Sequence, residues 1–188
     1  MGFALAAAAA EAGAAVTLVT GPVDQPTPPR VTRIDVDSAA DMLETCEQHI
    51  TNSDIFIAAA AVADFRPASC ADSKIKKRDG EDELTLKLVK NPDILATMAT
   101  RKSEQPSLLC VGFAAETNDV ETNARAKIER KQLDMIIAND VSRSDIGFGS
   151  DDNEVLLITP GTTTTLDKAS KPQLARLLIA QIAELLFA

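Results

Sequence analysis

The chain has 188 residues, 45% of them hydrophobic, and a formal net charge of -9. This length allows a single domain, residues 1–188, with a sizeable core, and the acidic balance argues against a nucleic-acid partner. No apolar stretch is long enough for a membrane span and the opening lacks a basic n-region, so we expect a cytoplasmic protein with no membrane partner.

The cysteines are odd in number and widely spaced, at Cys46, Cys70 and Cys110. They match no disulfide framework, zinc spacing or paired redox motif. Cys46 falls in a predicted helix and Cys110 in a predicted strand, so we interpret both as packing residues.

The chain opens with an alanine-rich helix, Met1 to Ala12, which Gly13 ends as a left-handed cap. A strand is predicted from Ala14 to Thr20. A helix that feeds a strand is half of a βαβ unit, whose first strand and phosphate-binding turn would come before the helix. We therefore expect that the chain is a fragment, or that its first strand comes from elsewhere.

The next segment, Val23 to Arg30, is proline-rich and predicts a surface loop. It leads into a short strand from Val31 to Val36. Asp37-Ser38 then supplies an N-cap for a helix that runs to about Ile50.

A central stretch combines a buried strand with charged residues. The apolar run Ile55 to Ala60 is typical of a strand buried on both faces of a parallel sheet, and Asp64 and Arg66-Pro67 follow it. A cationic cluster comes next, at Lys74, Lys76, Lys77 and Arg78. Ligands of open α/β sheets lie beyond the carboxyl ends of strands, so this stretch is a candidate site. A solvated charged face is the alternative.

Residues Glu83 to Lys90 alternate strictly between apolar and polar, which indicates an antiparallel or edge strand. Asp79-Gly80, just before them, is a turn signal. The change of period predicts a β-arm at about residues 74–90 that leaves the main sheet. Because the unpaired backbone groups of an exposed edge strand can hydrogen-bond to another chain, the arm predicts a homodimer.

A strong helix start follows, with Asn91 as N-cap, Pro92 at the first helical position and Asp93 in the first turn. This helix should run to about Lys102. The elements predicted after it are a strand at 107–114, a helix at 119–131, a strand at 134–138, a loop at 142–152, a strand at 154–159, a threonine-rich turn and a helix at 171–187.

Strands that alternate with helices predict an α/β fold with a doubly wound, Rossmann-like, mainly parallel sheet. The strand ends at Ala60, Ala114 and Ala138 would share one edge. The residues expected near that edge are Asp64, Lys74, Phe113, Glu116, Asn139 and Asp140. Lys127 and Lys131 share a helix face, either as solvated charges or around an anion.

Several motifs together carry a family resemblance. The segments AAAVADFRP, KIKK, LKLVKNPDIL, VGFAAETNDV, KQLDMIIAND and GFGSDDNEV occur in this order over nearly the whole chain. They resemble phosphopantothenoylcysteine synthetase, the phosphopantothenate-cysteine ligase of coenzyme A biosynthesis. Met1-Gly2 matches the end of that family's SSGKMG segment, whose earlier residues, with an asparagine used in the second half-reaction, are not in this chain. The resemblance also implies a fused or associated decarboxylase domain.

The resemblance implies a two-step ligation that uses CTP, 4'-phosphopantothenate and cysteine, passes through an acyl-cytidylate, and has Mg²⁺ with the triphosphate. It implies no flavin in this chain. Lys74 is the implied catalytic residue, and Asp64 orients the metal or the ribose. The implied nucleotide-binding residues are Ala58, Ala59, Ala60, Asp64, Lys74, Pro92, Asp93, Ile94, Leu95, Phe113, Lys127 and Lys131.

The residue types fit this chemistry independently of the family. A triphosphate beside a substrate with a phosphate and a carboxylate gathers negative charges that repel unless cations neutralise them. Lysines suit this task as flexible point charges. Two alternatives remain open, a Rossmann-like enzyme that uses NAD or S-adenosylmethionine and a non-catalytic nucleotide-binding scaffold.

Overall fold

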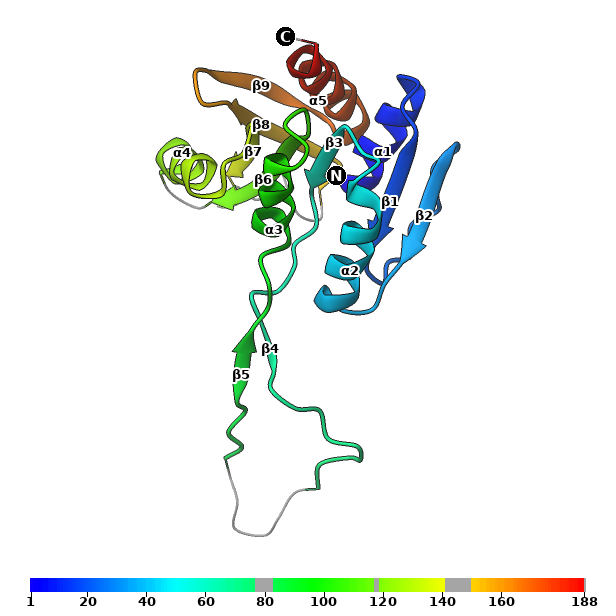
Figure 1. Cartoon of the computed structure of the whole chain (residues 1–188), viewed down its shortest axis with the longest axis vertical. Coiled ribbons are helices and arrows are strands. Elements are labelled where there is room, and N and C mark those ends of the chain that lie inside the picture. The colour runs from blue at the N-terminus through cyan, green and yellow to red at the C-terminus, as the bar shows by residue number, and fades with distance from the viewer. Residues whose placement is uncertain (77–82, 117–118, 141–149, 188) are drawn as a thin grey trace.

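The structure, a computed structural model, describes residues 1–76, 83–116, 119–140 and 150–187. Figure 1 shows a body of helices packed on strands, from which a long arm projects at one end. The arm follows β3 (Ile55–Ala58) in the chain and returns into α3 (Ile94–Thr100). Its root therefore lies where the central predicted strand ends.

Most strands belong to one five-stranded sheet with the order β3-β6-β7-β8-β9. Its first three strands run parallel, and β8 and β9 join antiparallel. The remaining strands of this sheet are β6 (Leu109–Glu116), β7 (Met135–Asp140), β8 (Asp152–Ile158) and β9 (Thr163–Ser170). The predicted mixed α/β fold with a mainly parallel sheet is thus confirmed.

A second, smaller sheet consists of β1 (Val16–Thr20) and β2 (Val31–Asp35), which pair in parallel. Among the described residues, β1 pairs only with β2, and β3 pairs only with β6. The prediction that Ile55 to Ala60 is buried on both faces is therefore wrong. The strand stops at Ala58 and its residues are only half-buried, because β3 lies at the edge of its sheet.

Five α-helices cover the strands of the described chain: α1 (Gly2–Glu11), α2 (Ala39–Ile50), α3, α4 (Val120–Lys131) and α5 (Lys171–Leu186). A 3-10 turn, η1 (Arg101–Ser103), extends α3. The predicted start of α2 is confirmed, because the Ser38 hydroxyl accepts the Asp41 N–H and the Asp41 carboxylate accepts the Ser38 N–H. Gly13 follows α1 with a φ of 97°, as a left-handed cap requires.

The core consists of two apolar clusters, one on each face of the larger sheet. Neighbouring residues of β6 point to opposite faces, so Cys110 joins the cluster under α2, α3 and α4, whereas Val111 joins the cluster under α1 and α5. Met98 and Leu178 anchor the two clusters and are both fully buried. Full burial of side chains of this size contributes about 1.5 to 3 kcal/mol each.

Thr163 to Ser170 form a strand rather than the predicted threonine-rich turn, which is a second correction. Only Thr159 to Thr162 turn, with the Thr159 N–H donating to the Thr162 carbonyl over 3.0 Å. The next threonines continue as β9, an antiparallel partner of β8. Their β-branched side chains suit a pleated, largely exposed strand.

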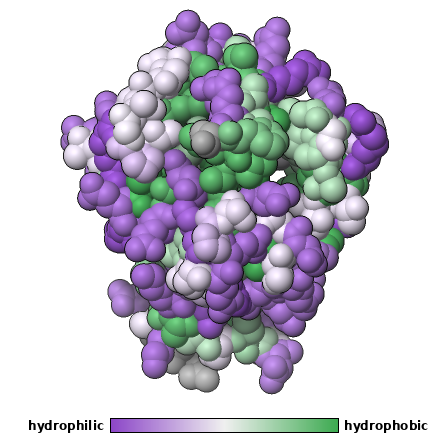
Figure 2. Space-filling model, turned by 45° about the horizontal axis from the view of Figure 1, so that its top comes forward, coloured by the Kyte–Doolittle hydropathy of each residue, from purple (hydrophilic) through white to green (hydrophobic). Residues whose placement is uncertain are grey.

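The arm is a thin antiparallel ladder of β4 (Phe65–Pro67) and β5 (Leu88–Lys90). Only the last three residues of the predicted strand Glu83 to Lys90 form β5, with one further backbone hydrogen bond from Ala68 to the Lys87 carbonyl, and its antiparallel sense is confirmed. Leu84, Leu86 and Leu88 are 67%, 61% and 54% exposed. Figure 2 shows hydrophobic residues at the surface of the arm, at the lower end of the view.

Some predicted features lie outside the described residues. These are Lys77, Arg78, the Asp79-Gly80 turn and most of the loop at 142–152. Within the described ranges, no helix combines the length and the apolar character needed to cross a membrane.

Candidate functional site

The carboxyl ends of β3, β6 and β7 meet at one edge of the sheet. Ala58 pairs with Gly112, and Phe113 pairs with Ile137 on the next strand. After β3 the backbone leaves the sheet, with Ala59 half-buried and Ala60 exposed. Ala59 and Phe113 belong to the same apolar cluster. The structure therefore brings the predicted alanine segment and Phe113 to the same edge, as expected for parallel strands.

Asn91 organises the root of the arm. Its side-chain amide donates to the Ala63 carbonyl over 2.8 Å, and its side-chain oxygen accepts from the Arg66 guanidinium over 2.9 Å. Its backbone N–H donates to the Asp64 carbonyl over 2.7 Å. Asn91 is only 8% exposed. It thus fixes the loop after β3 relative to the start of α3.

The prediction that Asn91 caps α3 is wrong. The N-cap is Asp93, whose carboxylate accepts the Ala96 N–H over 3.0 Å, so Pro92 lies before the helix rather than at its first position. The Asn91 side chain is occupied by Ala63 and Arg66. Both Asx residues have capping character, and only tertiary contacts decide between them.

Asp93 also binds Lys131, at the far end of α4. The Lys131 Nζ lies 2.7 Å from one carboxylate oxygen and 3.0 Å from the other. Burial raises the pKa of the Asp93 carboxyl, but hydrogen bonds from Lys131 and the Ala96 N–H and the charge of Arg130 outweigh it, so the net pKa is lowered. Two segments of the predicted site, 92–95 and α4, are therefore joined through charged groups.

The start of α3 also packs closely on β6. A Cβ built on Gly112 would lie 2.6 Å from the Leu95 Cδ2, so any larger residue at position 112 would require the Leu95 side chain to shift. Ile94 is buried beside it in the core under α3. Ile94 thus acts in packing, and the half-buried Leu95 packs against the same core and on Gly112 of β6.

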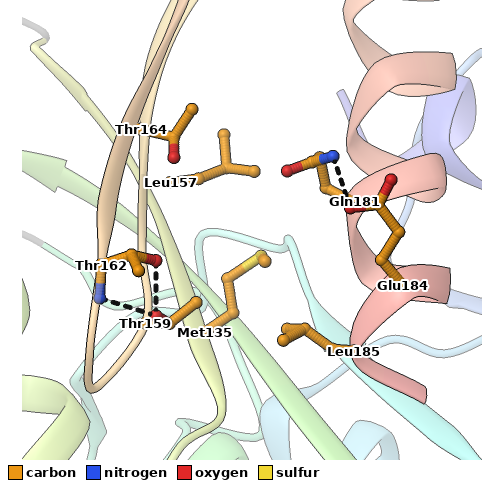
Figure 3. A pocket seen from close by; sticks show the side chains of 8 residues that line it. All are labelled: Met135, Leu157, Thr159, Thr162, Thr164, Gln181, Glu184 and Leu185. Atoms are coloured by element: carbon orange, nitrogen blue, oxygen red, sulfur yellow. Dashed lines mark hydrogen bonds between the residues drawn. The ribbon is translucent and has the colours of Figure 1, made fainter. Parts of the chain in front are cut away.

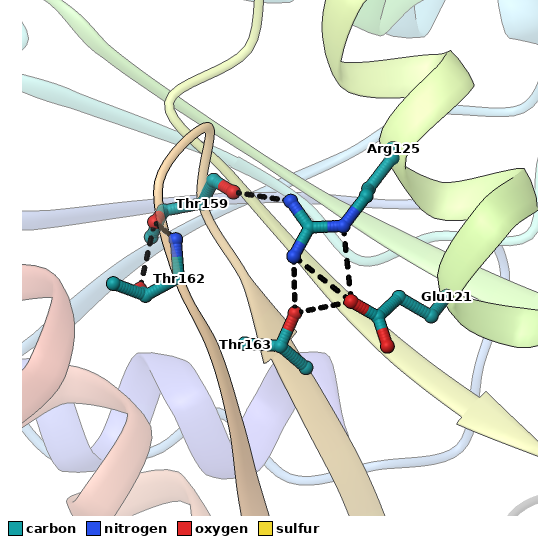
Figure 4. Close-up of polar contacts among 5 residues, drawn as sticks. All are labelled: Glu121, Arg125, Thr159, Thr162 and Thr163. Atoms are coloured by element: carbon teal, nitrogen blue, oxygen red, sulfur yellow. Dashed lines mark hydrogen bonds and ion pairs between the residues drawn. The ribbon is translucent and has the colours of Figure 1, made fainter.

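α4 carries Lys127 and Lys131, both half-buried, on one flank. Its other flank holds Glu121 and Arg125, whose guanidinium contacts the Glu121 carboxylate at 2.8 and 3.0 Å and the Thr163 hydroxyl at 2.6 Å. Figure 4 shows these groups gathered against the β8–β9 turn. Hydrogen bonds from Thr163 and then Arg125 lower the pKa of the Glu121 carboxyl. An acid four residues before a base is a sequence signal for such a pair.

Asp64 and Lys74 lie in different parts of the arm, since the Asp64 carbonyl accepts the Asn91 N–H at the arm root. Both side chains are exposed, and Lys74 follows β4 in the chain, in the arm segment that Figure 1 shows extending away from the body. The described residues contain no group of three or more histidine, cysteine or acidic side chains placed to hold a metal. Asn139 is buried near the end of β7, and the side chains of Glu116 and Asp140 lie outside the described residues.

A hollow of about 280 Å³ lies elsewhere, between α5 and the β8–β9 hairpin (Figure 3). Its lining comprises Met135, Leu157, Thr159, Thr162, Thr164, Gln181, Glu184 and Leu185. None of the predicted site residues lines it. The candidate site is therefore the open sheet edge at the arm root and not this hollow.

Two of the thiols are suited to packing. Burial raises the pKa of the Cys46 thiol to about 11, and burial and then the Asp134 charge raise the pKa of the Cys110 thiol to about 11. Both therefore stay protonated at neutral pH. Cys70 is exposed, and all three cysteines are free.

Comparison with known proteins gives consistent matches over nearly the whole chain. Residues 1–186 match the DNA/pantothenate metabolism flavoprotein C-terminal domain. The chain is 50% identical over 186 residues to the coenzyme A biosynthesis bifunctional protein CoaBC of Vibrio vulnificus, covering 99% of this chain and 46% of that protein. It is 51% identical over 183 residues to the CoaBC of Escherichia coli, covering 97% of this chain and 45% of that protein.

The chain thus spans about half the length of the curated relatives it matches. A crystal structure of the C-terminal domain of CoaBC superposes with a TM-score of 0.80 at 35% identity, covering 98% of this chain and 81% of that one. Sequence and fold therefore agree on one assignment. The chain belongs to the DNA/pantothenate metabolism flavoprotein C-terminal domain family.

Proposed function

We propose that the chain forms the phosphopantothenate-cysteine ligase unit of a coenzyme A biosynthesis protein. In this reaction a carboxylate oxygen of 4'-phosphopantothenate attacks the α-phosphorus of CTP, and pyrophosphate leaves to give an acyl-cytidylate. The cysteine amine then attacks the acyl carbon and loses a proton, and CMP leaves as the amide forms. The names and similarity of the CoaBC relatives support this assignment.

The observation that carries the proposal is the convergence of separate segments at the carboxyl edge of the sheet. Ala58 pairs with Gly112, Leu95 packs on Gly112, and Asp93 binds Lys131. Open α/β sheets bind nucleotides at such an edge. The edge thus offers apolar walls for a base and a half-buried ammonium for phosphate charge.

The chemistry requires cations that act when charge develops. Lys131 and Lys127 lie on one flank of α4, where they would neutralise the triphosphate. Asp64, an exposed carboxylate after β3, fits a Mg²⁺ ion that is held mainly by phosphate oxygens, because Mg²⁺ takes few protein ligands in such sites. When bound, this ion would neutralise charge on the phosphates.

We propose that Lys74 acts from a partner subunit. Its loop is carried away from the body by the β4–β5 ladder, so it does not meet Lys131 of the same chain in this conformation. The exposed leucines Leu84, Leu86 and Leu88 alternate along the returning strand and offer a face to a second copy. A homodimer would then place each arm near the other subunit's sheet edge.

Two further parts of the assignment are proposals of the same kind. The matched relatives are bifunctional and about twice as long as this chain, which supports a decarboxylase domain joined or bound to it in a full-length protein. The three free cysteines support a reducing, cytoplasmic location.

The test is pyrophosphate release from CTP with 4'-phosphopantothenate, followed by amide formation with cysteine. It should be run on this chain and on a form extended at its amino end with the corresponding segment of the Vibrio vulnificus relative. Calorimetric titration should show binding of CTP rather than NAD. Binding of CTP without turnover in both forms would favour a scaffold, and binding of NAD alone would favour a different Rossmann-like enzyme.

Lys74→Gln should remove most ligase activity while the melting temperature stays unchanged, because an exposed loop lysine adds little stability. Lys87→Gln, a second lysine of the arm, is the matched control and should keep its activity. Near-normal turnover by the Lys74 variant would exclude its catalytic role.

A further inference from the structure

Apolar packing alone holds α4 weakly. Only two of its side chains are buried, Ala124 at 0% and Ile128 at 4% exposure, and one of them is a single methyl group. Its N-cap Asp119 makes no side-chain capping bond. A helix with so narrow an apolar stripe depends on polar contacts as well to fix its rotation about its own axis.

The two flanks of α4 have different partners. At about 100° per residue, Glu121 and Arg125 lie on one side of the buried stripe. Lys127 and Lys131 lie on the other side. Any rotation that moves the first pair toward the sheet therefore moves the lysines away from it.

The Arg125 flank is tied to a hydrogen-bonded turn. Besides Glu121 and Thr163, the guanidinium donates to the Thr159 carbonyl over 3.4 Å. The turn itself is closed by Thr159 and Thr162, whose hydroxyls lie 2.9 Å apart and whose backbone groups bond over 3.0 Å (Figure 4). The Thr163 hydroxyl also donates to Glu121 over 2.7 Å. These contacts connect α4 to the β8–β9 turn and to the first residue of β9.

The opposite flank ends in the pair of Lys131 with Asp93. A long, flexible lysine side chain can keep its ion pair when its helix moves slightly. The planar guanidinium of Arg125 donates its hydrogen bonds in fixed directions and so tolerates less movement. The stiffer restraint on the rotation of α4 is therefore the one at Arg125.

We propose that Arg125 is a positioning residue of the nucleotide site: by tying α4 to the β8–β9 turn, it sets the rotation of this helix and so the direction in which Lys127 and Lys131 point. This inference rests on the proposed function, in which those lysines neutralise the triphosphate of CTP. Arg125 itself lies on the far flank and does not touch the nucleotide.

The test is calorimetric titration of the whole chain with CTP and Mg²⁺. Arg125→Met removes the hydrogen bonds but keeps most of the side-chain volume, and it should weaken CTP binding by roughly tenfold through misplaced lysines. Thr163→Val removes one partner at nearly constant shape and should act in the same direction with a smaller effect. The second variant keeps the test valid if the first fails to fold.

Arg176→Met is the matched control, because Arg176 forms a similar exposed pair with Glu11, at 2.8 Å, between α5 and α1. It should leave CTP affinity unchanged. In a Lys131→Met background, Arg125→Met should weaken CTP binding much less, because one of the two lysines through which Arg125 acts is already absent.

The results distinguish failure of the proposed function from failure of the positioning role of Arg125. If the unaltered chain does not bind CTP in either its short or its extended form, the proposed function fails and the inference fails with it. If CTP binds normally to the Arg125 and Thr163 variants, or the Arg125 effect is undiminished without Lys131, only the positioning role is overturned.

Discussion

Asp93 shows how one side chain serves both the fold and the candidate site. Its carboxylate caps the amino end of α3 and also binds the Lys131 ammonium. The bond to Lys131 has no sequence signal that identifies its partner, because the two charged residues are 38 positions apart. The sequence predicted each residue as part of the site but could not predict that they bind each other.

Replacing Asp93 with alanine should lower the free energy of unfolding by about 1 to 2 kcal/mol, because the helix loses its cap. Asp93→Asn keeps a capping oxygen and should cost less than about 1 kcal/mol, since the pair with Lys131 is partly exposed. Urea denaturation of the three proteins at pH 7 gives both values.

The asparagine variant also predicts a pH dependence. The folded pKa of Asp93 is lowered, so its charge stabilises the fold above the unfolded pKa of about 3.9 and this contribution is lost as the pH falls through the folded pKa. The stability difference between the unaltered chain and the variant should therefore shrink from pH 5 to pH 2. An equal difference at both pH values would show that the charge of Asp93 plays no part.

At the scale of elements, the sequence correctly predicted the helices and strands that are determined by interactions between residues close together in the chain. Ser38 and the alanine-rich opening identified α2 and α1, and the alternation near Lys90 identified an antiparallel arm. The start of α3 was misplaced because Asn91 bonds to Ala63 and Arg66, 28 and 25 residues away. Strand β9 was missed because threonine suits both turns and strands, and its pairing with β8 decided the outcome.

The arm root offers a test at this scale. Asn91→Ala should cost about 1 to 3 kcal/mol, because the buried Asn91 side chain loses its hydrogen bonds to the Ala63 carbonyl and the Arg66 guanidinium. The arm should also become a faster substrate for limited proteolysis. Gln48→Ala removes an exposed amide whose Glu44 contact is 3.5 Å, and it should change neither property. Equal cleavage of the two variants would contradict the role of Asn91.

At the scale of the whole molecule, the arm is a thin element that presents apolar residues to solvent. If the proposed homodimer forms through it, sedimentation should give a dimer at micromolar concentration. Replacing Leu84, Leu86 and Leu88 with serine should then shift the chain toward monomer without unfolding the body, because these side chains are exposed within one chain. A monomer before any substitution would exclude this assembly.

The division between the two sheets has a consequence for how the molecule opens. Within the described chain β1 and β2 pair as strands only with each other, whereas β6 and β7 lie inside a continuous five-stranded ladder. The smaller sheet should therefore open as a separate cooperative unit, at a lower free energy than the larger one. Amide protons of β1 should exchange with deuterium well before those of β7, so native-state fluctuations would expose one side of the fold while the other stays closed.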